Sequence, residues 1–118
     1  AERHADAARG AGVDLSVAPL EQPGRGFELI INATASSLQA AAVPVPAEAL
    51  GSGALAIDLM YGPAAQAFLD WAVRHGARGR DGLGMLVEQA AEAFFVWRGV
   101  RPDSAPVLQA LRERLAAA

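Results

Sequence analysis

The sequence predicts an α/β domain in which helices cover a parallel sheet. Residues 27–33 and 54–61 are apolar at most positions, as expected of strands that are buried on both faces. Segments with helical periodicity alternate with these strands, and the links between them are short. Because such crossovers are right-handed, the alternation predicts a partial doubly wound, Rossmann-like sheet with flanking helices.

The first half of the chain is expected to run from a helix into two strands. An Ala-rich stretch opens it without Met or a capping residue, so we interpret the chain as a fragment that begins inside a helix closing at Gly10 or Gly12. Residues 13–19 suit a short strand that precedes the strand at residues 27–33. Residues 32–50 are expected to form a loop with a short helical turn near its end.

The second half is expected to contain three helices and a short strand. Residues 64–75 form the first helix, which Gly76 closes, and residues 77–80 form the strand. The next helix lies in the stretch DGLGMLVEQAAEAFFVW, and the last covers residues 103–116. The side chains expected to face inward from the first and last of these helices are Ala65, Phe68, Leu69, Ala72, Val73, Val107, Leu108, Leu111 and Leu115.

Composition and charge argue against several function classes. The formal net charge of -3 disfavours a nucleic-acid partner, and Arg74, Arg78 and Arg80 are expected to form a solvated helix exit. No apolar run approaches the ~18 residues of a membrane span, so no membrane partner is expected. The absence of Cys fits a cytoplasmic protein, and His4 and His75 are too isolated to form a metal site.

The chain contains no Gly-rich turn of the form G-x-G-x-x-G between a strand and a helix. In a dinucleotide-binding sheet that turn follows the first strand, so the chain is expected to be the later half of such a domain. Ligands of these sheets lie beyond the carboxyl ends of the strands. Residues 32–37, 58–61 and 81–84 occupy those ends and are predicted to carry the site.

Three motifs lie at these strand ends, in an order and spacing that belong together. INATASSL, IDLMYGPAAQAFL and DGLGMLVEQAAEAFFVWRG are similar to N-A-T-x-x-G-L, D-x-x-Y-x-P-x-x-T-x-F/L and D-G-x-x-M-L-x-x-Q-A-x-x-x-F-x-x-W-x-G of the shikimate dehydrogenase family. The resemblance runs from residue 27 to the C-terminus. Ser37 and Gln66 depart from it, because the family usually has Gly and Thr there.

The resemblance implies an oxidoreductase that reversibly reduces 3-dehydroshikimate to shikimate with NADPH, in aromatic amino-acid biosynthesis. Residues 1–118 then represent the C-terminal part of the NADP-binding domain. The substrate domain, the catalytic Lys and Asp and the Gly-rich loop belong upstream. Because the chain contains no Lys, no catalytic residue is expected in it, and the chain alone is expected to be inactive.

The resemblance also implies residues that contact the cofactor. Leu59 and Gly82 match positions that border the nicotinamide, and a glycine lets the backbone approach the ring without a Cβ in the way. Asn32 and Thr34 lie in a loop that passes close to the cofactor. The expected cofactor is therefore NADP, and no metal is expected.

Two polar residues match positions that reach the substrate, shikimate or 3-dehydroshikimate. Tyr61 and Gln89 each combine a donor and an acceptor, which suits a ring with several hydroxyls. Each has a structural alternative: Tyr61 as a core aromatic, and Gln89 as a surface amide beside Glu88 and Glu92. Taken without the resemblance, Gly82 is an ordinary turn residue.

Two other interpretations of function stay open. A quinate-oxidising relative shares the same C-terminal motifs, and a non-catalytic binding or assembly module is possible if this half is used by itself. Half of a doubly wound sheet also leaves an apolar strand unpaired, here residues 13–17 or 27–31. The chain is therefore expected to self-associate.

Overall fold

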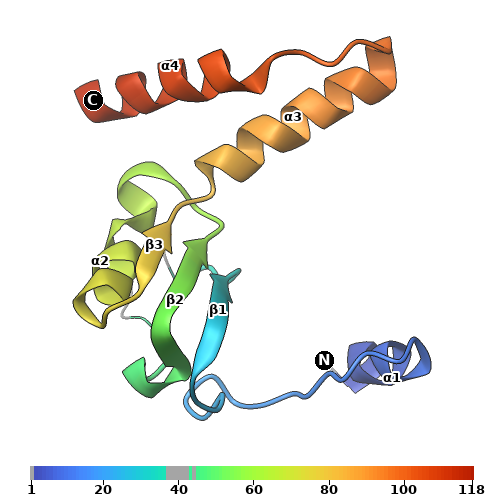
Figure 1. The fold of residues 1–118 in the computed structure, drawn as a ribbon, viewed down its shortest axis with the longest axis vertical. Helices are drawn as coiled ribbons and strands as arrows, with labels where there is room; N and C mark the ends of the chain where they lie inside the picture. The colour runs from blue at the N-terminus through green and yellow to red at the C-terminus, as the bar shows by residue number, and fades with distance from the viewer. Residues whose placement is uncertain (1, 37–42, 44) are drawn as a thin grey trace.

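The computed structural model describes residues 2–36, 43 and 45–118 (Figure 1). In chain order its elements are α1 (Glu2–Gly10), β1 (Phe27–Asn32), the 3-10 helix η2 (Ala47–Ala49), β2 (Leu50–Asp58), the 3-10 helix η3 (Gly62–Ala65), α2 (Gln66–Arg74), β3 (Arg78–Arg80), α3 (Leu83–Arg98) and α4 (Ser104–Ala117).

The three strands form one parallel sheet in the order β1-β2-β3, which confirms the predicted fold class. Ile31 of β1, Ile57 of β2 and Arg80 of β3 lie in one row across the sheet. Because the strands run in the same direction, their carboxyl ends share one edge, and α3 leaves the sheet from that edge (Figure 1).

Helix α2 covers one face of the sheet and builds the core with it. Small side chains on β2 let the helix approach closely, and a Cβ added at Gly79 of β3 would lie only 3.1 Å from Leu69 Cδ2. The predicted inward stripe is wrong at Val73, which is 63% exposed, whereas Trp71 is 8% exposed. Burying the larger indole surface gains more than burying a valine. The buried cluster consists of Ala54, Ala56, Phe68, Trp71, Ala72 and Ala77.

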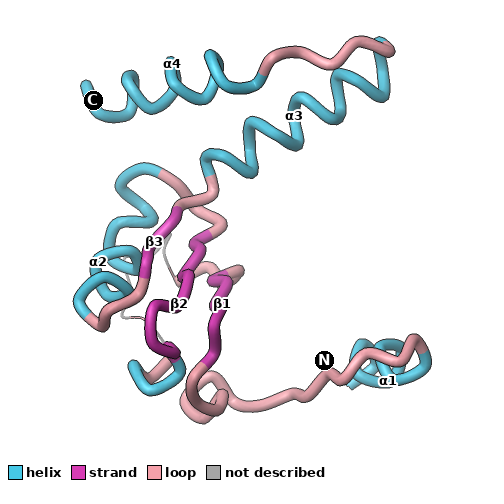
Figure 2. Tube along the Cα trace, in the orientation of Figure 1, coloured by secondary structure: helices cyan, strands magenta, loops and turns pink. Residues whose placement is uncertain are grey.

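Two strand predictions are corrected by the structure. Residues 13–19 form no strand. They lie in the exposed loop that joins α1 to β1 (Figure 2). A strand needs a hydrogen-bonded neighbour, and among the described residues the sheet contains no partner for this segment. Strand β2 also begins earlier and ends earlier than residues 54–61, because Leu50 already pairs with Phe27 and the chain turns away after Asp58.

Helices α3 and α4 extend from the carboxyl edge of the sheet and lie against each other (Figure 1). Gly99, with φ +69°, ends α3 in the left-handed conformation that glycine favours, and the chain reverses there. Ser104 Oγ donates to Glu88 Oε1 over 2.6 Å across the two helices. Val107 was predicted to face inward but is 50% exposed, because it lines an open groove on α3 rather than the sheet.

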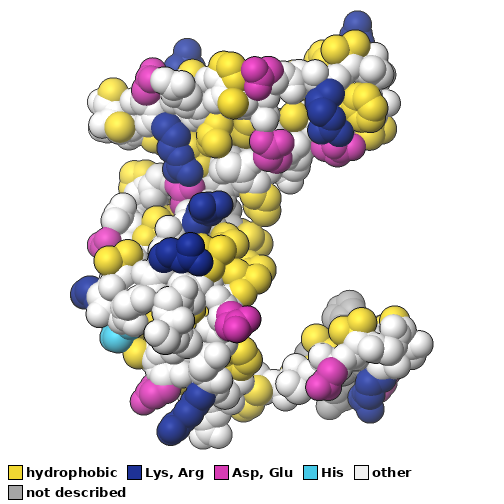
Figure 3. Space-filling model, in the orientation of Figure 1, with side chains coloured by type: hydrophobic (Ala, Val, Ile, Leu, Met, Phe, Trp, Pro, Cys, Tyr) yellow, Lys and Arg dark blue, Asp and Glu magenta, His cyan; other side chains and the backbone are white. Residues whose placement is uncertain are grey.

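Large apolar side chains stay exposed on several parts of the molecule, including β1 and the far end of α3. Leu29 and Ile31 on β1 are 50% and 53% exposed, and Trp97 at the far end of α3 is 77% exposed. Figure 3 shows hydrophobic side chains gathered over these elements. Within the part of the chain that the structure describes, no helix has the length and apolarity needed to cross a membrane.

Candidate functional site

The backbones of the three strand-end segments are joined at the carboxyl edge of the sheet. Leu59 N, just beyond β2, donates to Asn32 O at the end of β1 over 3.0 Å. Gly82 N, just beyond β3, donates to Met60 O over 2.8 Å. The sequence predicted that these segments carry one site, and the structure brings Asn32, Leu59 and Gly82 together there.

A buried polar pair supports this edge from inside. Asn32 is 7% exposed and Asp58 is fully buried, and Asn32 Nδ2 donates to Asp58 Oδ2 over 3.1 Å. Asp58 Oδ1 accepts a hydrogen bond of 2.9 Å from Met60 N, which turns the chain out of β2. Both side chains therefore order the loops, because a buried polar group must be paired to be tolerated.

Thr34 organises the loop that follows β1. Its Oγ1 donates to Asn32 Oδ1 over 2.7 Å, and its backbone N–H donates to the same oxygen over 3.1 Å. Ser36 N in turn donates to Thr34 Oγ1 over 3.2 Å. The polar atoms of Asn32 and Thr34 thus bind one another, so what this loop offers a ligand is mainly its shape and backbone.

Gly82 is required by close packing against Leu59. A Cβ added at Gly82 would lie 2.1 Å from Leu59 O and 2.6 Å from the Leu59 carbonyl carbon. The φ of Gly82 is -79°, a value that any residue adopts, so space rather than conformational freedom demands the glycine. Gly84, two residues later, has no atom within 4 Å of an added Cβ. The two residues predicted to border the nicotinamide are therefore in direct contact.

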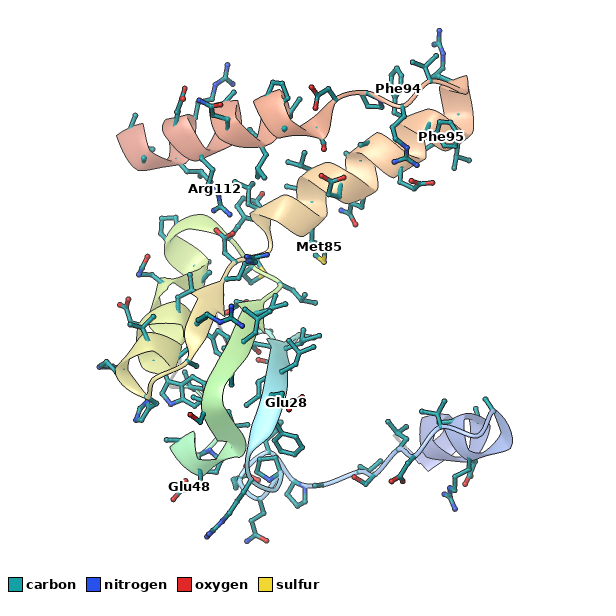
Figure 4. All side chains as sticks on the ribbon, viewed as in Figure 1. Glu28, Glu48, Met85, Phe94, Phe95 and Arg112 are labelled. Atoms are coloured by element: carbon teal, nitrogen blue, oxygen red, sulfur yellow. The ribbon has the colours of Figure 1, made fainter. Side chains whose placement is uncertain are left out.

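The two predicted substrate residues are both exposed, Tyr61 beyond the end of β2 and Gln89 within α3. Tyr61 immediately precedes η3 and is 40% exposed, so it is not a core aromatic. Gln89 lies one turn after Met85. Figure 4 shows Met85 pointing from α3 to the side opposite α4. The spacing of four residues places Gln89 on the same side of the helix as Met85. Its neighbour Glu88 instead reaches Ser104 beside α4.

An ion pair that the sequence analysis missed joins the site to the C-terminal helix. Arg112 Nη1 and Nη2 donate to Asp81 Oδ2 and Oδ1 over 2.5 and 2.6 Å, and the Asp81 side chain is only 8% exposed. Burial raises the pKa of the Asp81 carboxyl, but hydrogen bonds from Arg112, Leu83 N and Gly62 N outweigh it, so that pKa is lowered. The same pair raises the pKa of Arg112.

Comparisons with known proteins identify the kind of molecule to which this edge belongs. Residues 82–112 match the family description "Shikimate 5'-dehydrogenase C-terminal domain". The chain is 63% identical, over 97% of its length, to the shikimate dehydrogenase (NADP(+)) of Paracidovorax citrulli. It is 62% identical, over 98% of its length, to that of Acidovorax sp. strain JS42. The chain belongs with the C-terminal part of the shikimate dehydrogenase family. It spans 41% of the length of both relatives.

Solved structures support the same placement. A shikimate 5-dehydrogenase from Thermus thermophilus, in complex with NADP(H) and shikimate, matches 95% of this chain with a TM-score of 0.72 and 34% identity. The match covers 42% of that chain. A 5-ketofructose reductase from Gluconobacter matches 86% of this chain with a TM-score of 0.66 and 32% identity. The shikimate dehydrogenase fold is thus shared with a reductase whose name specifies a different substrate.

The groups at this edge of the chain are suited to binding and orienting a ligand. Among the described residues, no group of three or more His, Cys, Asp or Glu side chains is placed to hold a metal ion. The edge presents the partly buried Leu59 side chain, the exposed Tyr61 phenol and, further out on α3, the exposed Gln89 amide, whereas the Gly82 peptide is itself buried. A flat heteroaromatic ring and a hydroxylated substrate suit these groups.

Proposed function

We propose that this chain is the C-terminal part of the NADP-binding domain of a shikimate dehydrogenase. That enzyme transfers a hydride reversibly between NADPH and 3-dehydroshikimate, giving shikimate. The observation that carries the proposal is the convergence of the three family motifs at one edge of the sheet, with Leu59 packed on Gly82. The high identity to named shikimate dehydrogenases over almost the whole chain supports it.

In this proposal Leu59 and Gly82 border the nicotinamide, and the loop with Asn32 and Thr34 lies near the rest of the cofactor. NADPH supplies the hydride when it is bound. The residues present fit such a ring, because Leu59 offers an apolar side chain and Gly82 adds no side chain of its own. The buried Asn32–Asp58 pair holds the Leu59 backbone in place, so the ring meets a surface that is formed in advance.

Tyr61 and Gln89 would bind the substrate through its hydroxyl groups. Both side chains are exposed, and each donates and accepts hydrogen bonds. The resemblance assigns proton transfer to a Lys, and this chain contains none. The catalytic Lys and Asp and the diphosphate loop are therefore assigned to the remaining part of the relatives' length, and the chain alone is proposed to be inactive.

The exposed apolar side chains of β1 form a surface to which a second chain can bind. The described part of the chain pairs β1 with β2 along one edge, and Leu29 and Ile31 are about half exposed. An unpaired apolar strand is a template for further pairing. We therefore propose that the 118-residue chain self-associates, and that in the longer relatives a segment outside the matched part covers this face. A cytoplasmic location, without nucleic-acid or membrane partners, belongs to the same proposal.

A chimera tests the function directly. This chain replaces the matching 116-residue segment of the Acidovorax relative, and the product is assayed for shikimate-dependent reduction of NADP. We expect kcat/KM within about tenfold of the unmodified relative, whereas the relative truncated before this segment is expected to be inactive. A chimera that folds, by circular dichroism, but does not turn over shikimate contradicts the proposal and favours a non-catalytic module. A preference for quinate would support the quinate-oxidising alternative.

A further inference from the structure

The Asp81 carboxylate, just beyond β3, connects the start of α3 with α4 at the proposed site. It accepts hydrogen bonds from both terminal guanidinium nitrogens of Arg112 in α4 and from the N–H of Leu83 at the start of α3. The Leu83 bond measures 3.3 Å and the two Arg112 bonds 2.5 and 2.6 Å. Figure 4 shows the Arg112 side chain reaching from α4 toward the junction of β3 with α3.

The Asp81 carboxylate belongs to the residue that directly precedes Gly82, whose backbone is tightly packed. Gly82 directly follows Asp81, and its backbone is wedged against Leu59 with no room for a Cβ. Its N–H is bound to Met60 O over 2.8 Å. The Gly82 peptide is therefore held by Met60 on one side, and the adjoining Asp81 by Arg112 on the other.

The direction of α3 depends on the same junction. A helix rises about 1.5 Å per residue, so Gln89 lies roughly 9 Å from the first residue of α3. A change of about 10° at the junction would displace Gln89 by more than roughly 1 Å, which is enough to break a hydrogen bond to a substrate. The pair with Arg112 opposes such a change, because a bidentate contact restricts both distance and angle.

We propose that the Asp81–Arg112 pair is a positioning device, which holds Gly82 and the start of α3 in the geometry needed for hydride transfer. The inference rests on the proposed function, and it assigns to the C-terminal helix a part in that function. Arg112 is 46% exposed and the Asp81 side chain is 8% exposed, so solvent reduces what the pair adds to stability without removing it, while the bidentate geometry is retained. The pair therefore also acts on geometry, and Asp81 and Arg112 are positioning residues that act through Gly82 and Gln89.

The test compares Arg112→Leu, Arg112→Lys and Arg114→Leu in the chimera with the Acidovorax relative. Arg114 is an exposed arginine of the same helix and provides the matched control. We expect Arg112→Leu to lower kcat for shikimate oxidation about tenfold, with KM for NADP within about twofold. Arg112→Lys should recover part of this loss, because it keeps the charge but not the bidentate geometry.

A kinetic isotope effect separates positioning from general damage to the fold. With NADPH deuterated at the transferred position, Arg112→Leu should show a larger primary isotope effect on kcat for 3-dehydroshikimate reduction than the parent chimera. Hydride transfer becomes slower relative to the other steps when its geometry is loosened. An isotope effect and a kcat equal to those of Arg114→Leu would overturn the inference.

Hydrogen exchange tests the positioning effect of the Asp81–Arg112 pair separately from activity. Amides at the start of α3, at residues 82–86, should exchange faster in Arg112→Leu than in Arg114→Leu, in the chimera and in the 118-residue chain. If Arg112→Leu fails to fold, Asp81→Asn, which keeps an acceptor for Leu83 N, takes its place in both assays. An inactive but folded parent chimera contradicts the proposed function. Equal exchange rates of amides 82–86 in Arg112→Leu and Arg114→Leu contradict the positioning role of the Asp81–Arg112 pair.

Discussion

Gly82→Ala tests how tightly the strand-end loops fit together. A Cβ at this position would lie 2.1 Å from Leu59 O, whereas real Cβ atoms essentially never approach closer than 3.0 Å. The two backbones must therefore separate by about 0.9 Å. The obstructing atom is a main-chain oxygen rather than the end of a flexible side chain, so the loops themselves must move.

Two consequences are expected in the chimera with the Acidovorax relative. Overpacking at a tight contact costs about 1–3 kcal/mol, so the free energy of unfolding should fall by that amount. A displacement near 1 Å beside the reacting ring lowers rates by as much as about a hundredfold, so kcat/KM for shikimate should fall between roughly tenfold and a hundredfold. Urea denaturation followed by circular dichroism measures the first effect, and steady-state kinetics the second.

Gly84→Ala is the matched control for this substitution. It places the same methyl group in the same helical turn, but nothing lies within 4 Å of it. Alanine is a better helix former than glycine by about 1 kcal/mol, so this variant should be as stable as the parent or more stable. If Gly82→Ala matched Gly84→Ala in both stability and kcat/KM, the packing of Gly82 on Leu59 would not matter to the site.

Four further predictions follow from the same structure. Gln89→Ala in the chimera should lower kcat/KM for shikimate about ten- to a hundredfold, with KM for NADP within about twofold; an unchanged value would make Gln89 a surface amide. The 118-residue chain should bind no NADPH at submillimolar concentration in calorimetry, since the diphosphate loop is absent from its sequence, and a micromolar Kd would refute this. The same chain should sediment as oligomers that Ile31→Arg weakens, and a stable monomer at high concentration would count against an open β1 face. Because the pKa of Asp81 is lowered from 3.8, its contribution to stability is present above that pH and is lost as the pH falls through the lowered value; Asp81→Asn should flatten this acid limb in urea titrations.

Repeating local patterns in the sequence sufficed to predict the layered fold. The apolar runs that became β1 and β2 and the glycine that follows α2 act over a few neighbouring residues. Such short-range effects are written in adjacent positions, so they are visible without coordinates. The motifs likewise predicted which loops meet, because parallel strands share a carboxyl edge.

The sequence did not suffice to predict features that depend on a partner distant in the chain. Residues 13–19 have the composition of a strand but no neighbour among the described residues, so they remain a loop. Val73 and Trp71 both suit a helix that packs on a sheet, and which of them is buried depends on how α2 is rotated over β2. A propensity states what a segment tolerates, whereas burial is decided by the surface that it meets.

The sequence by itself determined the class of the fold, the family and the segments that are proposed to carry the site. Tertiary structure alone decided what those segments do to one another. It joined Asp81 to Arg112 across 31 positions and Asn32 to Asp58 across 26, and it set the Leu59 carbonyl where a Gly82 side chain would be. No periodicity links residues so far apart, because their distance in space results from how whole elements pack. Gly82 was predicted to be needed for the approach of a cofactor ring, and the structure gives it a first reason within the chain.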